Sequence, residues 1–217
     1  MATTTVPAPI FVVLFSGKRF AGKTTSASVF ESQFVKLRQA HAPDLYARTV
    51  RVSLGMAVKE QYADENKIPL EALITQGPTK AQHLAGLIAI AERERARDPQ
   101  HWARLAWQRA CYKFSSTHPN LVVIDDHRQP EEREFFQTLP GVGVCAIRVS
   151  ASAVAFVDRG MKYDVAIDRG PTETGLDTVP EEYWAARVEN SGSIDELATK
   201  LSDVARGVLG VLFPDHQ

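Results

Sequence analysis

Residues 11–24, FVVLFSGKRFAGKT, place an apolar run directly before the pattern G-x-x-x-x-G-K-T. A buried strand that leads into a glycine-rich turn and then into a helix is the context in which this pattern binds polyphosphates. Gly17 and Gly22 permit close backbone approaches, so successive N–H groups can turn inward around phosphate oxygens. We therefore predict a phosphate-binding loop over residues 17–24. The alternative is a glycine-rich turn that matches by chance, which the flanking strand and helix disfavour.

Each part of the phosphate-binding loop has its own predicted role. Lys23 is expected to reach the β- and γ-phosphates, and the Thr24 hydroxyl is expected to ligate Mg²⁺. The helix that begins near Lys23 adds the positive end of its dipole. Lys18 and Arg19 add two further positive charges, which suit a polyanion better than a protein partner. The expected nucleotide-binding residues here are Gly17, Lys18, Arg19, Ala21, Gly22, Lys23, Thr24 and Thr25.

The bulk composition predicts one globular domain of ordinary size. The chain has 217 residues, 44% of them hydrophobic and 24% charged, with a net charge of −1. This balance gives no reason to expect a nucleic acid or a membrane as a partner. Residues 1–9 are expected to form a flexible tail, and residues 10–217 a single domain. The two cysteines, Cys111 and Cys145, are expected to be buried free thiols, which suits a reducing, cytoplasmic environment.

Strand-like and helix-like segments alternate along the chain, which predicts an α/β fold with a parallel sheet flanked by helices. The expected strands cover about 10–16, 49–54, 121–126, 142–149 and 187–189. The expected helices cover about 23–39, 57–67, 80–97, 99–114, 130–139, 151–160 and 194–212. The mixed polar and glycine-containing residues 162–177 are interpreted as the mobile part of a lid that spans about 151–177.

Carboxylates and arginines suggest how phosphoryl transfer could be supported. Asp125 and Asp126 end a predicted apolar strand, and an acidic residue at such a position holds Mg²⁺ in phosphate-loop proteins. Asp126 is the predicted metal residue, because Asp125 could still face the sheet; a helix cap is the alternative role. Four arginines fall in segments expected to surround the open end of the sheet: Arg95, Arg104, Arg128 and Arg159.

Several separated motifs together resemble the animal-type phosphomevalonate kinases, a branch of the nucleoside-monophosphate-kinase-like phosphate-loop proteins. LFSGKR at residues 14–19 is similar to the opening of that family, and VKEQYA at 58–63 is similar to its next motif. DHR at 126–128 lies where the family has D-T-R, and ETGLD at 173–177 and VEN at 188–190 resemble its later motifs. The resemblance covers roughly residues 10–210.

The resemblance implies a kinase that transfers the γ-phosphoryl group of ATP to the phosphate of 5-phosphomevalonate, with Mg²⁺. It implies a monomer and a phosphorylated small-molecule substrate. In this interpretation Lys18, Arg19 and Lys23 act in catalysis at the nucleotide, Arg159 stabilises the transferring group from the lid, and Asn190 lies near the adenine. The residues implied on the acceptor side are Lys59, Lys80, Arg95, Arg104 and Arg128.

The chain also departs from the family where the acceptor is expected to bind. Leu84 and Gln129 stand where the family has arginines, and an arginine near Phe156 is absent. Each buried arginine–phosphate contact contributes about 1.5–3 kcal/mol as a charge-assisted hydrogen bond. The alternatives are therefore a kinase for a nucleoside monophosphate or another phosphorylated molecule, and a nucleotide-binding module without transfer activity.

Overall fold

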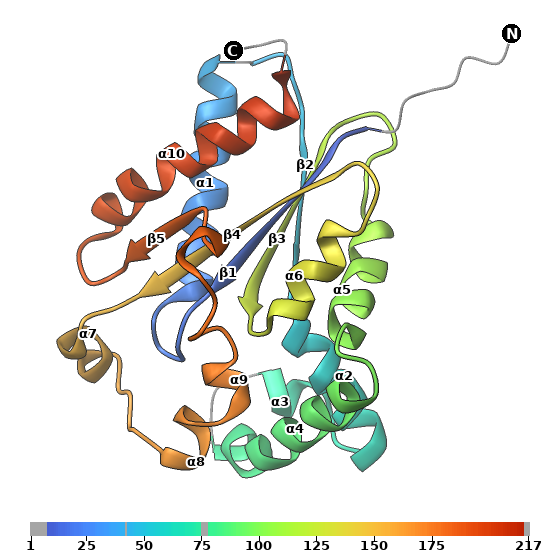
Figure 1. The fold of residues 1–217 in the computed structure, drawn as a ribbon, viewed down its shortest axis with the longest axis vertical. Helices are drawn as coiled ribbons and strands as arrows, with labels where there is room; N and C mark the ends of the chain where they lie inside the picture. Colours follow the sequence, from blue (N-terminus) through green and yellow to red (C-terminus); the bar gives the residue numbers. More distant parts are fainter. Residues whose placement is uncertain (1–7, 42, 75–77, 215–217) are drawn as a thin grey trace, which may run out of the picture.

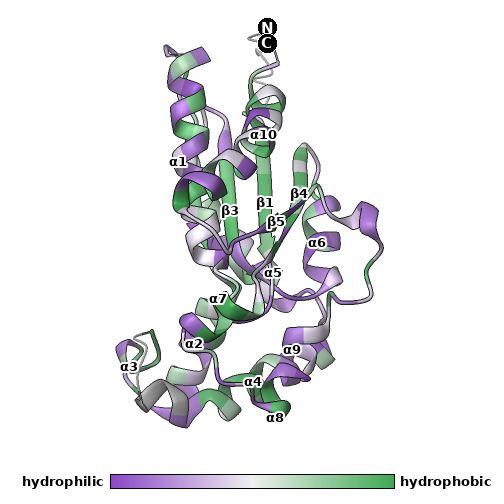
Figure 2. Ribbon diagram, turned by 90° about the vertical axis from the view of Figure 1, so that its left-hand side faces the viewer, coloured by the Kyte–Doolittle hydropathy of each residue, from purple (hydrophilic) through white to green (hydrophobic). Residues whose placement is uncertain are grey.

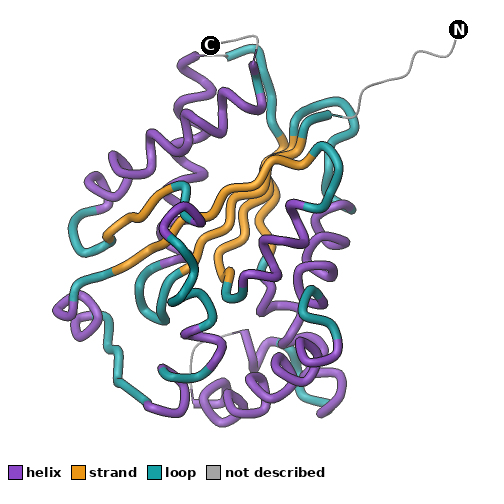
Figure 3. Tube along the Cα trace, viewed as in Figure 1, coloured by secondary structure: helices purple, strands orange, loops and turns teal. Residues whose placement is uncertain are grey.

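The fold is built on a five-stranded, fully parallel sheet with the strand order β2-β3-β1-β4-β5 (Figure 1). The computed structural model describes residues 8–41, 43–74 and 78–214. The strands lie side by side in one twisted layer with helices on both faces (Figure 3). Their bounds are Ile10–Ser16 for β1, Arg48–Val52 for β2, Asn120–His127 for β3, Val142–Ser150 for β4 and Ala186–Glu189 for β5.

The central strand β1 is buried on both faces, as expected for a parallel sheet that is covered on both sides. Phe11, Val13 and Phe15 belong to the core on one face, whereas Val12 and Leu14 belong to the core on the other. This alternation follows from the two-residue period of a strand. The apolar colour of β1 and β3 contrasts with the polar outer surfaces of the helices (Figure 2).

Two groups of helices cover the two faces of the sheet. On the Phe15 face lie α1 (Lys23–His41) and α10 (Ile194–Leu212), whose Phe30, Phe34 and Leu201 are fully or almost fully buried. The core on the Leu14 side is built from α2 (Leu54–Asn66), α3 (Glu71–Ile74), α4 (Pro78–Arg97), α5 (His101–Cys111) and α6 (Pro130–Gln137). No helix of the described residues is long and apolar enough to cross a membrane.

The strand order places the phosphate-binding loop at the middle of the sheet. The carboxyl ends of all five parallel strands meet at one edge, and the chain runs to opposite sides of β1 in its two halves. Ligands bind at such a switch point in open α/β sheets. Residues 151–177, which the sequence predicts to form a lid and which are called the lid segment below, follow β4 and contain α7 (Ala153–Asp158), α8 (Val165–Asp168) and α9 (Pro171–Thr174). A 3₁₀ turn, η1 (Glu181–Tyr183), precedes β5.

The expected α/β architecture is confirmed, but several local expectations were wrong. Leu54 begins α2 instead of ending β2, because the Ser53 hydroxyl caps the helix by accepting from the Met56 N–H at 3.2 Å. Residues 162–177, expected to be a mixed segment without regular structure, contain the two single-turn helices α8 and α9. Cys111 is exposed, although both cysteines are free as expected. The predicted flexible tail falls largely on residues 1–7, outside the described residues.

Candidate active site

Close backbone packing explains why the phosphate-binding loop needs both of its glycines. A Cβ atom on Gly17 would lie 2.3 Å from the Val149 carbonyl oxygen, and Gly17 has a φ of +155°. A Cβ atom on Gly22, whose φ is +88°, would lie 2.0 Å from Asn190 Nδ2. The Asn190 side chain is buried and donates to the Ala21 carbonyl at 3.1 Å. The loop is therefore clamped between β4 and the end of β5.

Lys23 lies inside this clamp with its ammonium group directed at loop carbonyls. Its Nζ donates to the carbonyl oxygens of Gly17 and Lys18, both at 2.9 Å. Burial, and next the nearby positive charge of Arg128, lower the pKa of Lys23 to about 7. Negative charge brought to the loop is expected to raise this pKa again, because an opposite charge favours the ammonium form.

Nucleotide binding is therefore expected to take up a proton at mildly alkaline pH. Free Lys23 has a pKa of about 7, so at pH 8 it is mostly neutral before phosphates bind and more protonated afterwards. ATP affinity should fall as the pH rises from 7 through the pKa of the bound state. Calorimetry at pH 8 without Mg²⁺, in two buffers of different ionisation enthalpy, measures the uptake. Equal binding enthalpies in the two buffers would contradict the proton uptake, and Lys23→Met should abolish the uptake.

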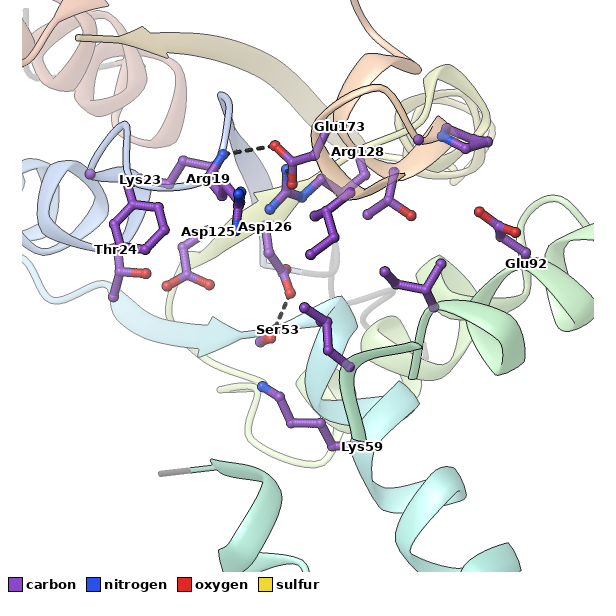
Figure 4. Close-up of a pocket in the computed structure, with 18 of the residues that line it drawn as sticks. Arg19, Lys23, Thr24, Ser53, Lys59, Glu92, Asp125, Asp126, Arg128 and Glu173 are labelled. Carbon is purple, nitrogen blue, oxygen red and sulfur yellow. Dashed lines mark hydrogen bonds and ion pairs between the residues drawn. The ribbon is translucent and has the colours of Figure 1, made fainter. Parts of the chain in front are cut away.

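The two carboxylates at the end of β3 point to different neighbours (Figure 4). Asp126 caps the start of α2. It accepts from the backbone N–H groups of Leu54 at 2.8 Å and Gly55 at 2.7 Å, and from the Ser53 hydroxyl at 2.7 Å. Asp125 lies on the other side, beside Thr24. Burial, and next the Asp126 charge, raise the pKa of Asp125, while a hydrogen bond from Thr24 opposes this rise.

Asp125 and Asp126 are expected to respond differently to loss of charge. Asp126→Asn should lower the unfolding free energy by about 1–2 kcal/mol, because a carboxylate that caps α2 is weakened. Asp125→Asn should leave the melting temperature unchanged or raise it, since a buried charge is removed, but should raise the Mg²⁺ concentration needed for half-maximal turnover. Thermal melts and Mg²⁺ titrations of both variants measure this. The reverse pattern would support Asp126 as the metal residue, as predicted from the sequence.

A cavity of ≈ 970 Å³ extends from the phosphate-binding loop toward α2, α4 and the lid segment. Arg19, Lys23, Thr24 and Thr25 line the nucleotide end. A connected cavity of ≈ 230 Å³ continues the space and shares Lys59, Leu84, Ile88 and Arg128 with it. The α4 side of these cavities is apolar at Leu84 and Ile88 and charged at Glu92 and Arg95. This shape fits two ligands placed end to end, one of them rich in negative charge.

Carboxylates of the lid segment pair with the positively charged groups around the phosphate-binding loop. Glu173, only 7% exposed, accepts from the backbone N–H of Arg19 at 2.7 Å and from Arg128 Nη1 at 2.7 Å. Asp168 pairs with the Arg19 guanidinium through contacts of 2.6 and 2.7 Å. Lys18 pairs with Asp177. Glu173 thus sits where loop donors and an arginine converge, an arrangement that also suits a phosphate group.

Removing the Glu173 charge is expected to strengthen nucleotide binding. In Glu173→Gln, a phosphate of ATP no longer competes with a carboxylate for the backbone N–H of Arg19. We expect the ATP dissociation constant to fall about 5- to 10-fold, the range of one charge-assisted hydrogen bond after partial compensation by the amide. Calorimetry without acceptor measures it. The matched control is the exposed Glu182→Gln, and an unchanged or weakened affinity in Glu173→Gln would contradict the competition.

Comparison with known proteins decides the family. Residues 15–141 match the family "Phosphomevalonate kinase". The chain belongs to the phosphomevalonate kinase family. Among curated proteins, the phosphomevalonate kinase of Drosophila melanogaster is 26% identical over 172 residues, which cover 79% of this chain and 84% of that protein. The resemblance inferred from the sequence motifs is therefore confirmed.

Solved structures with a related outline include two kinases. A gluconokinase from Sinorhizobium meliloti 1021 aligns with a TM-score of 0.48 and 14% identity, covering 98% of this chain and 100% of that one. The Mycobacterium tuberculosis APS kinase CysC, solved with AMPPNP and APS, aligns with a TM-score of 0.47 and 15% identity, covering 92% and 99%.

The structure brings some of the residues implied by the family into the cavities and leaves others outside. Lys59, Arg95 and Arg128 line the smaller cavity. Arg104 does not line either cavity: its side chain is 49% exposed and pairs with Asp98 at 3.1 Å. The backbone of Lys80 lies in α4, but its side chain is outside the described residues.

Residues expected at the lid and the adenine support the loop from outside. Arg159 donates to the Phe20 carbonyl at 3.0 Å and to the Asn190 carbonyl, so it contacts the outer side of the phosphate-binding loop. Gln129, where the sequence resemblance implies an arginine in the family, donates to the Pro171 carbonyl at 2.9 Å. In this member of the phosphomevalonate kinase family, Gln129 therefore fastens the lid segment instead of lining either cavity.

Sequence reasoning weighed Asp125 but preferred Asp126, and it quoted Glu173 only as part of the ETGLD motif, with no role of its own. The alternation along β3 could have identified Asp125, because Leu121 and Val123 face the α1 side and Val122 and Ile124 face the α2 side. The same two-residue period puts Asp125 with α1, next to Thr24, and Asp126 with α2. The ETGLD motif marks the position of Glu173, but no local signal indicates that its side chain contacts a loop residue 154 positions earlier in the chain.

Proposed function

We propose that this protein transfers the γ-phosphoryl group of ATP to the phosphate group of 5-phosphomevalonate, giving the diphosphate and ADP. The observation that carries the proposal is a cavity lined by the phosphate-binding loop and by Lys59, with Arg128 beside the loop between them. This arrangement, in a chain of the phosphomevalonate kinase family, supports binding of a nucleotide and an anionic acceptor in line.

Positioning and charge neutralisation account for the proposed reaction. An oxygen of the acceptor phosphate attacks the γ-phosphorus, and the bond from that phosphorus to the β–γ bridging oxygen breaks. No side chain has to remove a proton, because the acceptor phosphate is already anionic. The protein's contribution is to hold the two phosphates together and to place positive charge around the transferring group. Lys18, Arg19, Lys23 and Arg128 are the residues proposed to supply that charge.

Thr24 and Asp125 are the residues that fit a magnesium ion. A hydroxyl and a carboxylate face each other beside the loop, and Mg²⁺ prefers such oxygen ligands together with substrate phosphates and water. Among the described residues no group of three or more His, Cys, Asp or Glu side chains could hold a metal by itself. This suits an ion that arrives with the nucleotide, and a bound Mg²⁺ would neutralise phosphate charge.

A panel assay tests the proposed acceptor. The protein is incubated with Mg-ATP and, separately, with 5-phosphomevalonate, mevalonate and each nucleoside monophosphate, and the ADP formed is measured. Turnover with 5-phosphomevalonate alone is the expected result. Turnover with a nucleotide and none with 5-phosphomevalonate would overturn the proposal and would fit the apolar wall formed by Leu84 and Ile88. ATP binding without any acceptor-dependent ADP would indicate a nucleotide-binding module.

A further inference from the structure

A buried carboxylate, Glu132, lies directly behind the acceptor end of the cavity. Glu132 is on the first turn of α6 and is 1% exposed. Its Oε2 accepts from the backbone N–H of Arg128 at 2.7 Å, from the backbone N–H of Gln129 at 3.1 Å and from His127 Nδ1 at 3.0 Å. One oxygen of this carboxylate therefore fixes the backbone from which the Arg128 side chain projects.

The other oxygen of Glu132 is directed toward Arg95. Glu132 Oε1 lies 3.9 Å from Arg95 Nη2 and has no hydrogen-bond partner. Arg95 comes from the last turn of α4, and its side chain is 16% exposed. Its Nε and Nη1 are buried and also lack partners. Unsatisfied buried donors on a charged group are costly and call for an explanation such as an absent ligand.

Arg95 and Arg128 line the same cavity of ≈ 230 Å³, together with Lys59. Three cations around one small space repel each other. Asp126, which also lines this cavity, and Glu173, which pairs with the Arg128 guanidinium at 2.7 Å, offset part of this repulsion but do not contact Arg95. Glu132 is the carboxylate that reaches both arginines, through the backbone of one and the guanidinium of the other. An exposed carboxylate would act more weakly on the two arginines, because water and salt would screen its charge.

We propose that Glu132 is a positioning residue for the phosphate acceptor. Its carboxylate links α6 to α4, so that Arg95 and Arg128 are held at a fixed separation facing one anionic ligand. Glu132 does not touch the ligand itself; it acts through the two arginines. This inference rests on the proposed function only in taking the smaller cavity to be the acceptor site.

Glu132→Gln tests the role of the charge, because the amide keeps an oxygen that can accept from the two backbone N–H groups at the start of α6. The KM for the acceptor is expected to rise about tenfold, which corresponds to a loss of ~1.4 kcal/mol in acceptor binding free energy. The KM for ATP and kcat should stay within about twofold of the parent values. Glu134→Gln, exposed on the same helix, is the matched control and should change neither constant.

A double-mutant cycle separates positioning from a purely structural cap. Arg95→Met alone should raise the acceptor KM. Adding Glu132→Gln to Arg95→Met should raise the acceptor KM by a smaller factor than Glu132→Gln does in the parent protein. The reason is that Glu132 acts on the ligand through Arg95 and Arg128, and the Arg95 contribution is already lost. Fully multiplicative effects, or equal effects on ATP and acceptor, would overturn the proposal. If Glu132→Gln does not fold, Glu132→Asp carries the test: it keeps the charge but draws it away from Arg95, and an unchanged acceptor KM would overturn the proposal.

The same experiment distinguishes failure of this inference from failure of the proposed function. If the parent protein turns over a phosphorylated acceptor other than 5-phosphomevalonate, the cycle is measured with that acceptor, and only the identity of the substrate is corrected. If no acceptor in the panel is turned over, binding of 5-phosphomevalonate and of inorganic phosphate is measured by calorimetry. Parent and Glu132→Gln proteins that bind them equally would overturn the positioning role.

Discussion

Replacing Lys23 with alanine is expected to lower kcat at least about 10³-fold, the scale of losing a charged group that meets the transferring phosphate. Lys23 Nζ is held by two loop carbonyls at 2.9 Å, so it is already aimed at the place where the phosphates bind. Removing it should not cost stability, because burial disfavours its charge and lowers its pKa to about 7. The melting temperature is expected to stay level or rise.

The control for Lys23→Ala is Lys36→Ala, an exposed lysine on the same helix α1, which should leave kcat and the melting temperature unchanged. Turnover is measured at saturating Mg-ATP and acceptor, so that weaker binding does not mimic a loss of chemistry. Near-normal kcat in Lys23→Ala would remove the phosphate-binding loop from the mechanism. A fall in kcat accompanied by a large fall in melting temperature would instead indicate damage to the loop.

The phosphate-binding loop could be predicted from the sequence because its determinants are local. An apolar strand, two glycines and a lysine followed by threonine lie within fourteen residues, and each acts on its immediate neighbours. The alternating order of strands and helices likewise identified the parallel sheet. The first turn of α2 was misplaced because its start depends on Asp126, more than 70 residues later in the chain, which accepts from the Leu54 and Gly55 N–H groups.

The contacts of the lid segment could not be predicted, because they join residues that are far apart in the sequence. Glu173 meets Arg19 and Arg128, and Asp177 meets Lys18 and Arg148. Composition indicates only that the segment is polar, and charge pairing between two loops has no period to detect.

Arg128→Ala is expected to raise the acceptor KM about 10- to 100-fold, the range of one lost charge-assisted contact of about 1.5–3 kcal/mol. The KM for ATP should change far less, because Lys23 and the loop N–H groups remain. Arg128 lies between the two ligands: it donates to the Gly17 carbonyl at 3.2 Å and to Glu173 at 2.7 Å, and it lines both cavities.

Arg97→Ala is the matched control for Arg128→Ala, because Arg97 is 69% exposed and pairs with Glu94 on its own helix. Arg128→Lys should restore the acceptor KM only in part, since an ammonium group cannot make the bidentate contact of a guanidinium. Equal increases in the KM values of ATP and acceptor would reject the acceptor-side role.

Arg128 is also expected to act on the nucleotide indirectly, through Lys23. The positive charge of Arg128 is the second cause, after burial, of the lowered Lys23 pKa. Without Arg128 the Lys23 pKa should rise, so Lys23 is already more protonated at pH 8 and ATP binding takes up fewer protons. Calorimetry in two buffers therefore gives a second readout on the same variant. Undiminished proton uptake in Arg128→Ala would show that the two cations are not coupled, even if the acceptor KM rises as expected.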